Sequence, residues 1–192
     1  MEINNNNFED QVFKNTSMPD GDLGHREFSN CVFNNCNFSG SRFSSSSFIG
    51  CSFSGCDLSN IKIDDCSFKD VKFENCKLLG VNFSRTNPFL LKWEFIKCRI
   101  SLCDFSNLEI KNSNFLDCQI NETNFINSNL TNCDFSDSDL YLSRFQNVNL
   151  EKANFVGAKN YAINISDSKL KKAKFSYPEV LALLDEFEII VE

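Results

Sequence analysis

A five-residue period in large apolar side chains runs through most of the chain and constrains its fold more than any other feature. The period spans residues 24–83 and, after a break, residues 93–175, and its central positions hold Phe, Leu or Ile almost throughout. Of the 21 phenylalanines, 19 lie on this register once Phe8 and Phe13 are included. Neither an α-helix, with a period of about 3.6, nor a plain strand, with a period of about 2, repeats in this way. A short fixed period instead predicts a solenoid, in which repeats stack on one another.

A second register, of small residues, lies two positions before each large one. All ten cysteines occupy it, and Ser, Ala, Val and Thr fill many of the other positions. We therefore expect two inward positions in every five, one bulky and one small, with the other three facing outward. Free cysteine in such a position behaves as a small buried hydrophobe. The sequence thus predicts reduced, shielded thiols in a reducing cytoplasm rather than a disulfide scaffold.

Units such as CNFSG (36–40), CDLSN (56–60) and ANFVG (153–157) make the chain resemble the pentapeptide-repeat family over about residues 6–176. The resemblance implies an all-β fold, a right-handed quadrilateral parallel β-helix in which four pentapeptides make one coil. About eight coils at a strand spacing of about 4.8 Å give a rod on the order of 40 Å long. Four units per coil predict one face of stacked Phe95, Phe115, Phe135, Phe155 and Phe175, and an opposite face of Phe105, Phe125, Phe145 and Ile165.

Two segments depart from the repeat. Residues 17–22 (SMPDGD) read as a turn, so we expect an irregular or bulged first coil. Within residues 84–94 the period gains two residues, and Pro88 suits a bulge or corner loop there. The apolar residues of this register break, among them Phe89 and Trp93, either patch the seam between two stacks of coils or form a protruding contact for a partner.

The end of the chain changes character, which predicts a separate unit, residues 177–192, after a repeat domain of residues 1–176. Tyr177-Pro178-Glu179 opens a short helix, and residues 187–191 read as a strand or extended arm. This apolar tail must cap the open end of the rod or bury itself against a second copy. The candidate dimer contacts are its apolar residues Leu181, Leu184, Phe187, Ile189 and Ile190.

Charge is spread unevenly along the chain, whose formal net charge is −7. Residues 101–151 carry eight acids and two bases, net −6, whereas residues 152–176 carry six lysines and one acid, net +5. Direct nucleic-acid binding requires a basic patch, which an acidic protein matches poorly. An acidic strip on the rod is either a solubilising surface that protects edges or a contact for a basic groove. Its members are Asp117, Glu122, Asp134, Asp137 and Asp139.

The sequence contains no evident catalytic constellation. Its single histidine, His25, lacks partners for a metal site, and there is no Ser/His/Asp set or phosphate loop. We therefore expect no enzymatic activity, no cofactor and no metal. The N-terminus lacks the basic start and apolar run of a signal peptide, and no stretch approaches a membrane span.

Within the family, the chain resembles the quinolone-resistance and microcin-immunity branch, because its tail, LALLDEFEIIVE, has a similar placement and pattern. That resemblance implies a cytoplasmic homodimer joined through the C-terminus. It also implies binding to DNA gyrase or topoisomerase IV by DNA mimicry, which protects the enzyme from quinolones or toxins. The large projecting loops of that branch are not evident in this sequence, and the lysines of residues 152–176 interrupt the acidic strip. The alternative is a protein-interaction scaffold of the same fold with a different partner.

Overall fold

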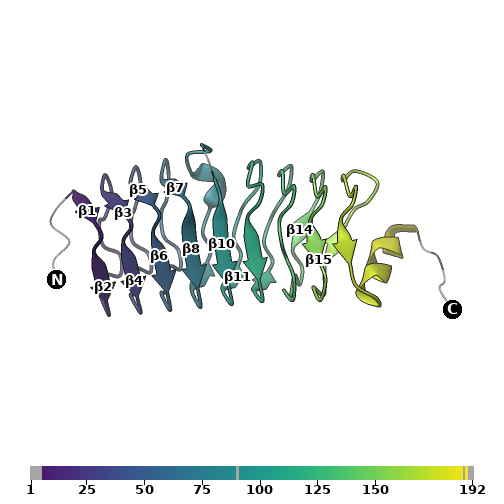
Figure 1. Cartoon of the computed structure of the whole chain (residues 1–192), viewed down its shortest axis with the longest axis horizontal. Helices are drawn as coiled ribbons and strands as arrows, with labels where there is room; N and C mark the ends of the chain where they lie inside the picture. The colour runs from purple at the N-terminus through teal and green to yellow at the C-terminus, as the bar shows by residue number, and fades with distance from the viewer. Residues whose placement is uncertain (1–5, 90, 188, 190–192) are drawn as a thin grey trace.

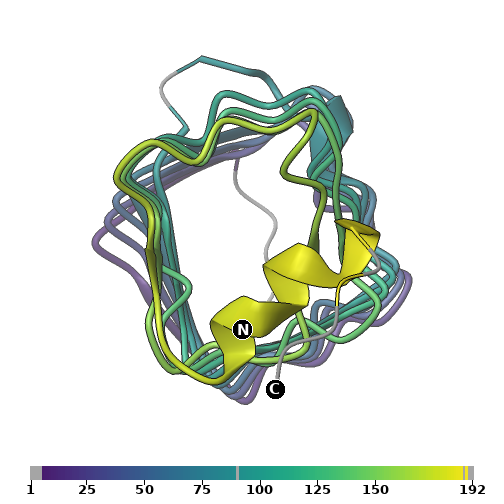
Figure 2. The ribbon, with the colours of Figure 1, turned by 90° about the vertical axis from the view of Figure 1, so that its right-hand side faces the viewer.

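The computed structural model describes residues 6–89, 91–187 and 189 and shows a rod of stacked coils with a short helix at one end (Figure 1). Each coil has four sides when seen along the rod (Figure 2). Every strand pairs in parallel with the strand one coil away rather than with its neighbour in sequence. The strands are β1 (Asn7–Glu9), β2 (Val12–Lys14), β3 (Glu27–Ser29), β4 (Val32–Asn34), β5 (Ser47–Ile49), β6 (Ser52–Ser54), β7 (Ser67–Lys69), β8 (Val71–Glu74), β9 (Lys77–Leu79), β10 (Trp93–Ile96), β11 (Arg99–Ser101), β12 (Asn114–Leu116), β13 (Gln119–Asn121), β14 (Arg144–Phe145), β15 (Asn154–Phe155), β16 (Ala162–Ile163) and β17 (Lys174–Phe175). The 3-10 helices are η1 (Phe83–Arg85) and η2 (Glu179–Phe187).

We number the four sides of the rod as faces 1 to 4 in chain order. Face 1 contains the sheet β1-β3-β5-β7, and face 2 contains β2-β4-β6-β8-β10-β12, followed by the pair β15-β17. Face 3 contains β9-β11-β13, and face 4 contains β14-β16. Isolated parallel bridges, such as Asn129 with Asn149, continue the ladders where no strand is assigned. This arrangement confirms the four-sided parallel β-helix predicted from the five-residue period.

Stacked phenylalanine rings fill the interior of the rod. On face 2, the rings of Phe115 and Phe135 lie 4.9 Å apart with planes only 3° from parallel. Phe125, from the opposite face 4, meets Phe115 edge to face at 5.7 Å and 89°. Aromatic pairs prefer both of these geometries. The alternation of Phe with Ile or Leu after residue 95 therefore packs ring against ring across the rod, and the face-2 centres stack as predicted.

The small inward residues contribute hydrogen bonds as well as small volume. All ten cysteines are buried and free, as predicted. Cys56 Sγ donates to Phe33 O of the preceding coil at 3.3 Å, and Ser138 Oγ donates to the equivalent Phe115 O at 2.6 Å. The position thus selects a side chain that is both small and a donor. Burial raises the pKa of the Cys66 thiol to about 12, which keeps the thiol protonated and unreactive.

One residue in five turns a corner of the rod with a positive φ, two positions after the large centre. Asn, Asp and Gly hold most of these positions because they tolerate left-handed backbone better than other residues. Stacked asparagines also form ladders: Asn147 Nδ2 donates to Asn127 Oδ1 at 2.9 Å, and Asn127 Nδ2 donates to Asn107 Oδ1 at 3.2 Å. The corners are therefore a third register of the repeat.

The first coil is regular, so the expected bulge at residues 17–22 is wrong. Ser17 and Asp22 form parallel bridges to the next coil, and Leu23 is buried on the large register. Asp20 turns its corner with the φ of 55° that other corners have. The Pro-Asp-Gly sequence that suggested a turn is one corner of the coil, because every corner of this fold is itself a tight turn.

Face 4 continues on Ile163 rather than on the predicted Ile165. β16 pairs with β14 so that Ile163 lies opposite Phe145, and Ile165 is only half-buried. The register moves because Tyr161 is drawn inside the rod, where its ring lies 5.6 Å from that of Phe175. A buried tyrosine two positions before Ile163 leaves no inward place for Ile165.

Helix η2 crosses the open end of the rod and is the short C-terminal helix that the sequence predicts (Figure 2). Ala182 and Leu183 on this helix pack against the buried core. The predicted strand or arm at residues 187–191 is only partly testable. Phe187 is the last residue of η2 and Ile189 belongs to no strand, while residues 188, 190 and 191 lie outside the described part of the chain.

Candidate functional site

The predicted acidic strip contains two kinds of carboxylate, and the first kind is free. Asp117 and Asp137 turn the corner after face 2 on successive coils, and Glu122 turns the corner after face 3, with φ of 52°, 59° and 51°. All three residues are exposed, and none forms a side-chain hydrogen bond or ion pair with any residue that the structure describes. At a coil spacing of about 4.8 Å, Asp117 and Asp137 place two free carboxylates side by side.

The second kind of carboxylate supports the rod. Asp134 Oδ1 accepts from the N–H two residues ahead at 2.9 Å and from Asn154 Nδ2 at 3.0 Å. Asp139 Oδ1 accepts from Asn160 Nδ2 at 2.7 Å, and Asp139 Oδ2 lies 3.7 Å from Lys159 Nζ. Asp134 and Asp139 are therefore half-buried ladder residues, whose oxygens are already bonded to the next coil.

The corner that carries Asp117 and Asp137 is acidic over two coils only. Lys97 turns the same corner one coil earlier, and Gly157 turns it one coil later. A Cβ at position 157 would lie 2.2 Å from Asp137 Oδ1, so a larger residue there would force the Asp137 side chain to move. The Asp137 side chain thus lies over the backbone of the next coil, and the paired carboxylates are held at a fixed height along the rod.

Leucines flank Glu122 on the next corner. Leu102 and Leu142 both have positive φ, 53° and 55°, and their side chains are 57% and 58% exposed. Left-handed backbone costs a non-glycine residue roughly 1–2 kcal/mol. Tyr141, beside Leu142, is also exposed. The exposed side chains of Leu102 and Leu142 stand at corners where most coils have Asn, Asp or Gly.

The lysines of residues 152–176 lie largely around a different corner. Lys152 and Lys172 turn the corner after face 1 on successive coils, with φ of 61° and 63°, and Lys171 and Lys174 flank it. These four lysines are exposed, and none pairs with an acid in the described part of the chain. The basic region therefore borders the acidic corners without covering them.

The predicted dimer contacts lie on η2 and just beyond it. Leu181 and Leu184 are half-buried, whereas Phe187 and Ile189 are 51% and 56% exposed. Ile190 lies outside the described residues. A groove of about 420 Å³ runs between this helix and the last coils, lined in part by Leu142, Ile163, Ala182 and Leu183. The capped end of the rod thus keeps exposed apolar surface.

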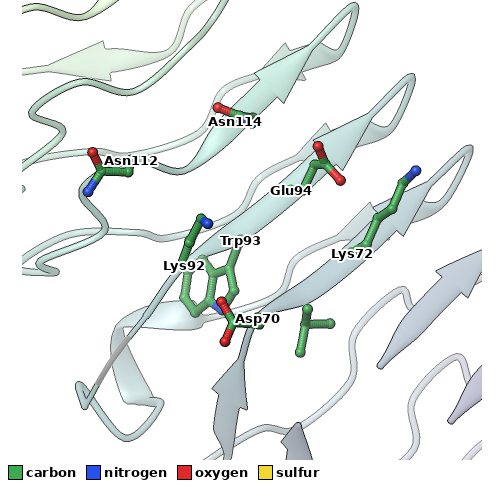
Figure 3. A pocket seen from close by; sticks show the side chains of 8 residues that line it. Asp70, Lys72, Lys92, Trp93, Glu94, Asn112 and Asn114 are labelled. Atoms are coloured by element: carbon green, nitrogen blue, oxygen red, sulfur yellow. The ribbon is translucent and has the colours of Figure 1, made fainter. Parts of the chain in front are cut away.

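Two concavities meet at the register break, where faces 1 and 2 join. One, of about 230 Å³, opens on face 2, where Lys72, Glu94 and Asn114 lie side by side on neighbouring strands (Figure 3). The other, of about 360 Å³, opens on face 1. The two share the residues of the corner itself, Asp70, Lys92 and Asn112.

Trp93 seals the interior of the rod at this break. It pairs with Val71 on the small register, and its ring lies 5.2 Å from that of Phe83 in the core. Its Nε1 donates to Phe68 O at 3.2 Å. Trp93 is 1% exposed, which supports the seam hypothesis for this residue, whereas Phe89 is 71% exposed and remains open to a partner. The sequence signal for this buried seal is a tryptophan at a position where the repeat otherwise has small residues.

No metal centre or membrane span is found in the described residues. Within them, no group of three or more His, Cys, Asp or Glu is placed to hold a metal ion. The helices that the structure describes are also too short and too polar to cross a bilayer.

A family model described as a pentapeptide repeat region matches residues 26–89, 66–145 and 98–175. Comparison with curated protein sequences finds no match. Among solved structures, a trypsin-treated form of QnrB1, a plasmid-mediated fluoroquinolone resistance protein, is 16% identical with a TM-score of 0.52, over 97% of this chain and 100% of that chain. HetL, a pentapeptide repeat protein involved in heterocyst differentiation regulation from the cyanobacterium Nostoc sp. strain PCC 7120, is 13% identical with a TM-score of 0.44, over 88% and 86%. At such identity the similarity to QnrB1 shows a shared fold.

Proposed function

Because the chain belongs to the pentapeptide-repeat family, we propose that it is a non-enzymatic interaction rod whose acidic corners bind DNA gyrase or topoisomerase IV in place of duplex DNA. The observation that carries this proposal is the set of exposed, unpaired carboxylates of Asp117, Glu122 and Asp137. Carboxylates on successive coils are about 4.8 Å apart, which is comparable to the axial rise of about 3.4 Å between phosphates of one DNA strand.

The contact between the acidic corners and the enzyme would depend on the attraction of opposite charges. A groove that binds DNA is basic, and rigid negative charges on a rod attract it at long range and in a fixed orientation. Screening by salt weakens attraction between exposed charges, with a Debye length of about 8 Å at physiological ionic strength. We therefore expect binding in the cytoplasm to be salt-dependent, and we expect protection of the enzyme from quinolones or toxins to follow from occupancy of its DNA groove.

A gyrase supercoiling assay, with and without a fluoroquinolone, tests the proposal. Without the drug, the protein should alter gyrase supercoiling. With the drug, it should preserve gyrase activity at a concentration that otherwise inhibits the enzyme. The triple variant Asp117→Lys, Glu122→Lys and Asp137→Lys should lose both effects, because it reverses the free carboxylates only. Asp134 is left intact since its hydrogen bonds support the ladder.

A matched control reverses three exposed acids elsewhere on the rod, Asp10, Glu27 and Asp65. It makes the same change in net charge and should keep wild-type behaviour. Equal loss in both variants would mean that overall charge, and no particular surface, governs the effect. A wild-type protein without effect on either enzyme would leave the second candidate, a scaffold for a different partner, which the exposed Leu102 and Leu142 beside Glu122 favour.

The apolar tail is proposed to join two rods end to end through a closed two-fold contact. The residues assigned to it are Leu181, Leu184, Phe187, Ile189 and Ile190. Light scattering on the intact protein and on a chain that ends at Ser176 should show a dimer that becomes monomeric or aggregates on truncation. The truncated chain also tests the division into units 1–176 and 177–192. A monomeric intact protein at tens of micromolar would contradict the dimer.

A further inference from the structure

The hydrogen-bond ladder of face 1 is interrupted at the register break. In earlier coils the corner N–H donates to the next coil: Asn30 to Ile49 O at 2.8 Å and Gly50 to Lys69 O at 2.9 Å. The equivalent N–H of Asp70 reaches no carbonyl among the residues that the structure describes. The same holds for the N–H of Phe68, which points to the next coil because successive residues of a parallel strand alternate in direction.

The coil on the other side of the break has matching unbonded groups. Asn129 and Asn149 donate back to the preceding coil, at 2.8 Å to Leu108 O and at 3.0 Å to Ser128 O. Glu109, one coil earlier on the same face, makes no such bond to any described residue. The carbonyl of Glu109 accepts no ladder bond from any described residue either. Two edges of one sheet therefore face each other across a gap, which we call the slot, between β7 and residues 109–111.

The chain leaves the slot for a local reason. Asn87 N–H still bonds to Cys66 O at 2.8 Å, in register with the previous coil. Its Oδ1 then accepts from Phe89 N–H at 3.1 Å, which turns the backbone outward, and the loop stands off the four-sided outline (Figure 2). Leu91 and Trp93 return to the interior and keep it dry. Leu91 and Trp93 thus fill the interior beside the break, whereas the backbone groups of Phe68, Asp70 and Glu109 that face the slot form no ladder bond with a described residue.

The concavity of about 360 Å³ on face 1 occupies this slot, and residues from both edges line it. Lys69 and Asp70 come from the edge formed by β7, Glu109 and Lys111 come from the edge formed by residues 109–111, and Lys92 comes from the loop. Lys111 Nζ already pairs with Glu109 at 2.8 Å. Lys69 and Lys92 are exposed and pair with no described acid, so the free charge around the slot is two lysines against the single Asp70.

We propose that the slot is a strand-addition site for an extended peptide segment of a partner protein that carries an acidic side chain. Backbone donors without partners are costly unless water or a ligand satisfies them. An extended segment supplies carbonyls to Phe68, Asp70 and Glu109 and an N–H to Glu109 O, which is the recognition mode of β-augmentation. The two free lysines select for a carboxylate on its outward side. The site is about three residues long, as are most of the rungs around it.

Amide hydrogen exchange tests the premise in the wild-type protein. The amides of Phe68, Asp70 and Glu109 should exchange at least tenfold faster than their counterparts one coil away, Phe48, Gly50 and Asn129. Similar protection at both sets would overturn the proposal, because it would mean that the donors are already bonded.

A random heptapeptide phage library, panned on the wild-type protein, then supplies the probe. Selected peptides should contain Asp or Glu, protect the three amides, and shift the fluorescence of Trp93, the only tryptophan, whose N–H bonds to Phe68 O on the floor of the slot. Methylation of the backbone nitrogen that serves Glu109 O should weaken binding at least tenfold. Failure to select any peptide, or no effect of methylation, would overturn strand addition.

A slot-closed variant is the matched control. Residues 84–94 are replaced by a copy of residues 64–72, which restores the regular coil and removes the gap. It should keep the far-UV spectrum of the rod and lose peptide binding, while its effect on gyrase stays unchanged, which separates this proposal from the function proposed above. Should this variant not fold, Lys69→Glu with Lys92→Glu serves instead and should weaken binding at least tenfold. Undiminished binding by either folded variant would refute the slot.

Discussion

The five-residue period fails at two places, and a buried aromatic residue repairs both. At residues 84–94 the period gains two residues, and Trp93 enters the interior from the register of small residues. In the last coils Asn160 stands where a large centre is expected, and Tyr161 enters the interior beside it. Both aromatic residues are almost fully buried, at 1% and 3% exposure. An aromatic residue displaced from its register can therefore restore a core that the repeat leaves incomplete.

The two repairs differ in how the polar atom of the ring is satisfied. The Trp93 N–H donates to Phe68 O, a carbonyl that the break deprives of its ladder partner. The Tyr161 hydroxyl is buried and has no partner in the described part of the chain. A break in mid-rod leaves two edges with unbonded groups, so that a donor finds an acceptor. The last coil has another coil on one side and only η2 on the other, and the Tyr161 hydroxyl finds no acceptor among the described residues.

The breaks also differ in their effect on register. After the first, β10 pairs with β8 at an offset of 22 residues in place of 20, and the two extra residues stay in the loop. At the second, Phe145 pairs with Ile163 at an offset of 18, but Asn149 already pairs with Lys169 at 20. The first break is an insertion, whereas the second is a local shift that the chain reverses within one side of the coil.

Trp93→Ala should produce the largest effect that separates the two repairs. It empties the interior between two packed coils and should lower the free energy of unfolding by about 3–5 kcal/mol. Tyr161→Ala should cost less, because its coil packs against the thin layer of η2 on one side. Denaturant unfolding followed by circular dichroism gives both values. Equal losses would show that position along the rod does not matter.

Ile163→Ala tests the reversed register directly. The buried Ile163 should cost about 2–4 kcal/mol when truncated, whereas Ile165→Ala, at a half-buried position, should cost less than about 1 kcal/mol. The same unfolding experiment measures both. The opposite ranking would restore the uninterrupted period and contradict the shift at Tyr161.

Phenylalanine substitutions isolate the polar atoms at neutral pH. Trp93→Phe keeps a ring but removes the donor to Phe68 O, and an unsatisfied buried acceptor should cost about 1–3 kcal/mol. Tyr161→Phe removes a hydroxyl without a partner and should be neutral or slightly stabilising. Thermal melts of the two variants, run side by side, are the comparison. A destabilised Tyr161→Phe variant would reveal a bond to the hydroxyl.

Between pH 10 and 12, ionisation of Tyr161 should lower the free energy of unfolding by up to about 1.4 kcal/mol per pH unit, whereas Trp93 has no such effect. Burial, and then the negative charge of Glu179, raise the pKa of Tyr161 to about 12. The folded state therefore holds this proton more tightly than the unfolded state, whose pKa is about 10. Stability from this group is intact below pH 10 and falls between pH 10 and 12.

The control for this pH effect is the phenylalanine variant at each site. Tyr161→Phe should lose less stability than wild type between pH 10 and 12, whereas Trp93→Phe should follow the wild-type slope. Parallel slopes for all three proteins would show that Tyr161 does not ionise with a raised pKa.

The sequence predicts the regular parts of the rod well because each inward position has the same surroundings in every coil. The faces of stacked centres and the burial of the cysteines follow from spacing alone. The corner register of Asn, Asp and Gly is also a fixed spacing in the sequence, but spacing alone does not reveal that these residues have positive φ. What spacing cannot predict is which side chain enters a gap, because that depends on the space left inside, as Trp93 and Tyr161 show.

The candidate site was predictable only in part, for a similar reason. The acidic residues are visible in the sequence, but their surroundings belong to residues 20 positions away. Asp134 is tied down by Asn154 and Asp139 by Asn160, and neither partner is recognisable as such before the coils are stacked. The slot beside Pro88 has no sequence signal other than the two extra residues, because its unbonded groups lie on β7 and Glu109.

Because the described strands of each coil pair only with the neighbouring coils, the number of coils sets the distance between features along the rod. Regular coils lie between the register-break concavities and η2, and removing 20 residues, such as 115–134, would bring these two features closer by one coil spacing of about 4.8 Å. Both features would keep their lining residues, because the strand pairs that the structure describes join only neighbouring coils. For a partner that contacts both the register-break concavities and η2, the number of repeats between them therefore determines whether the two contacts can form together.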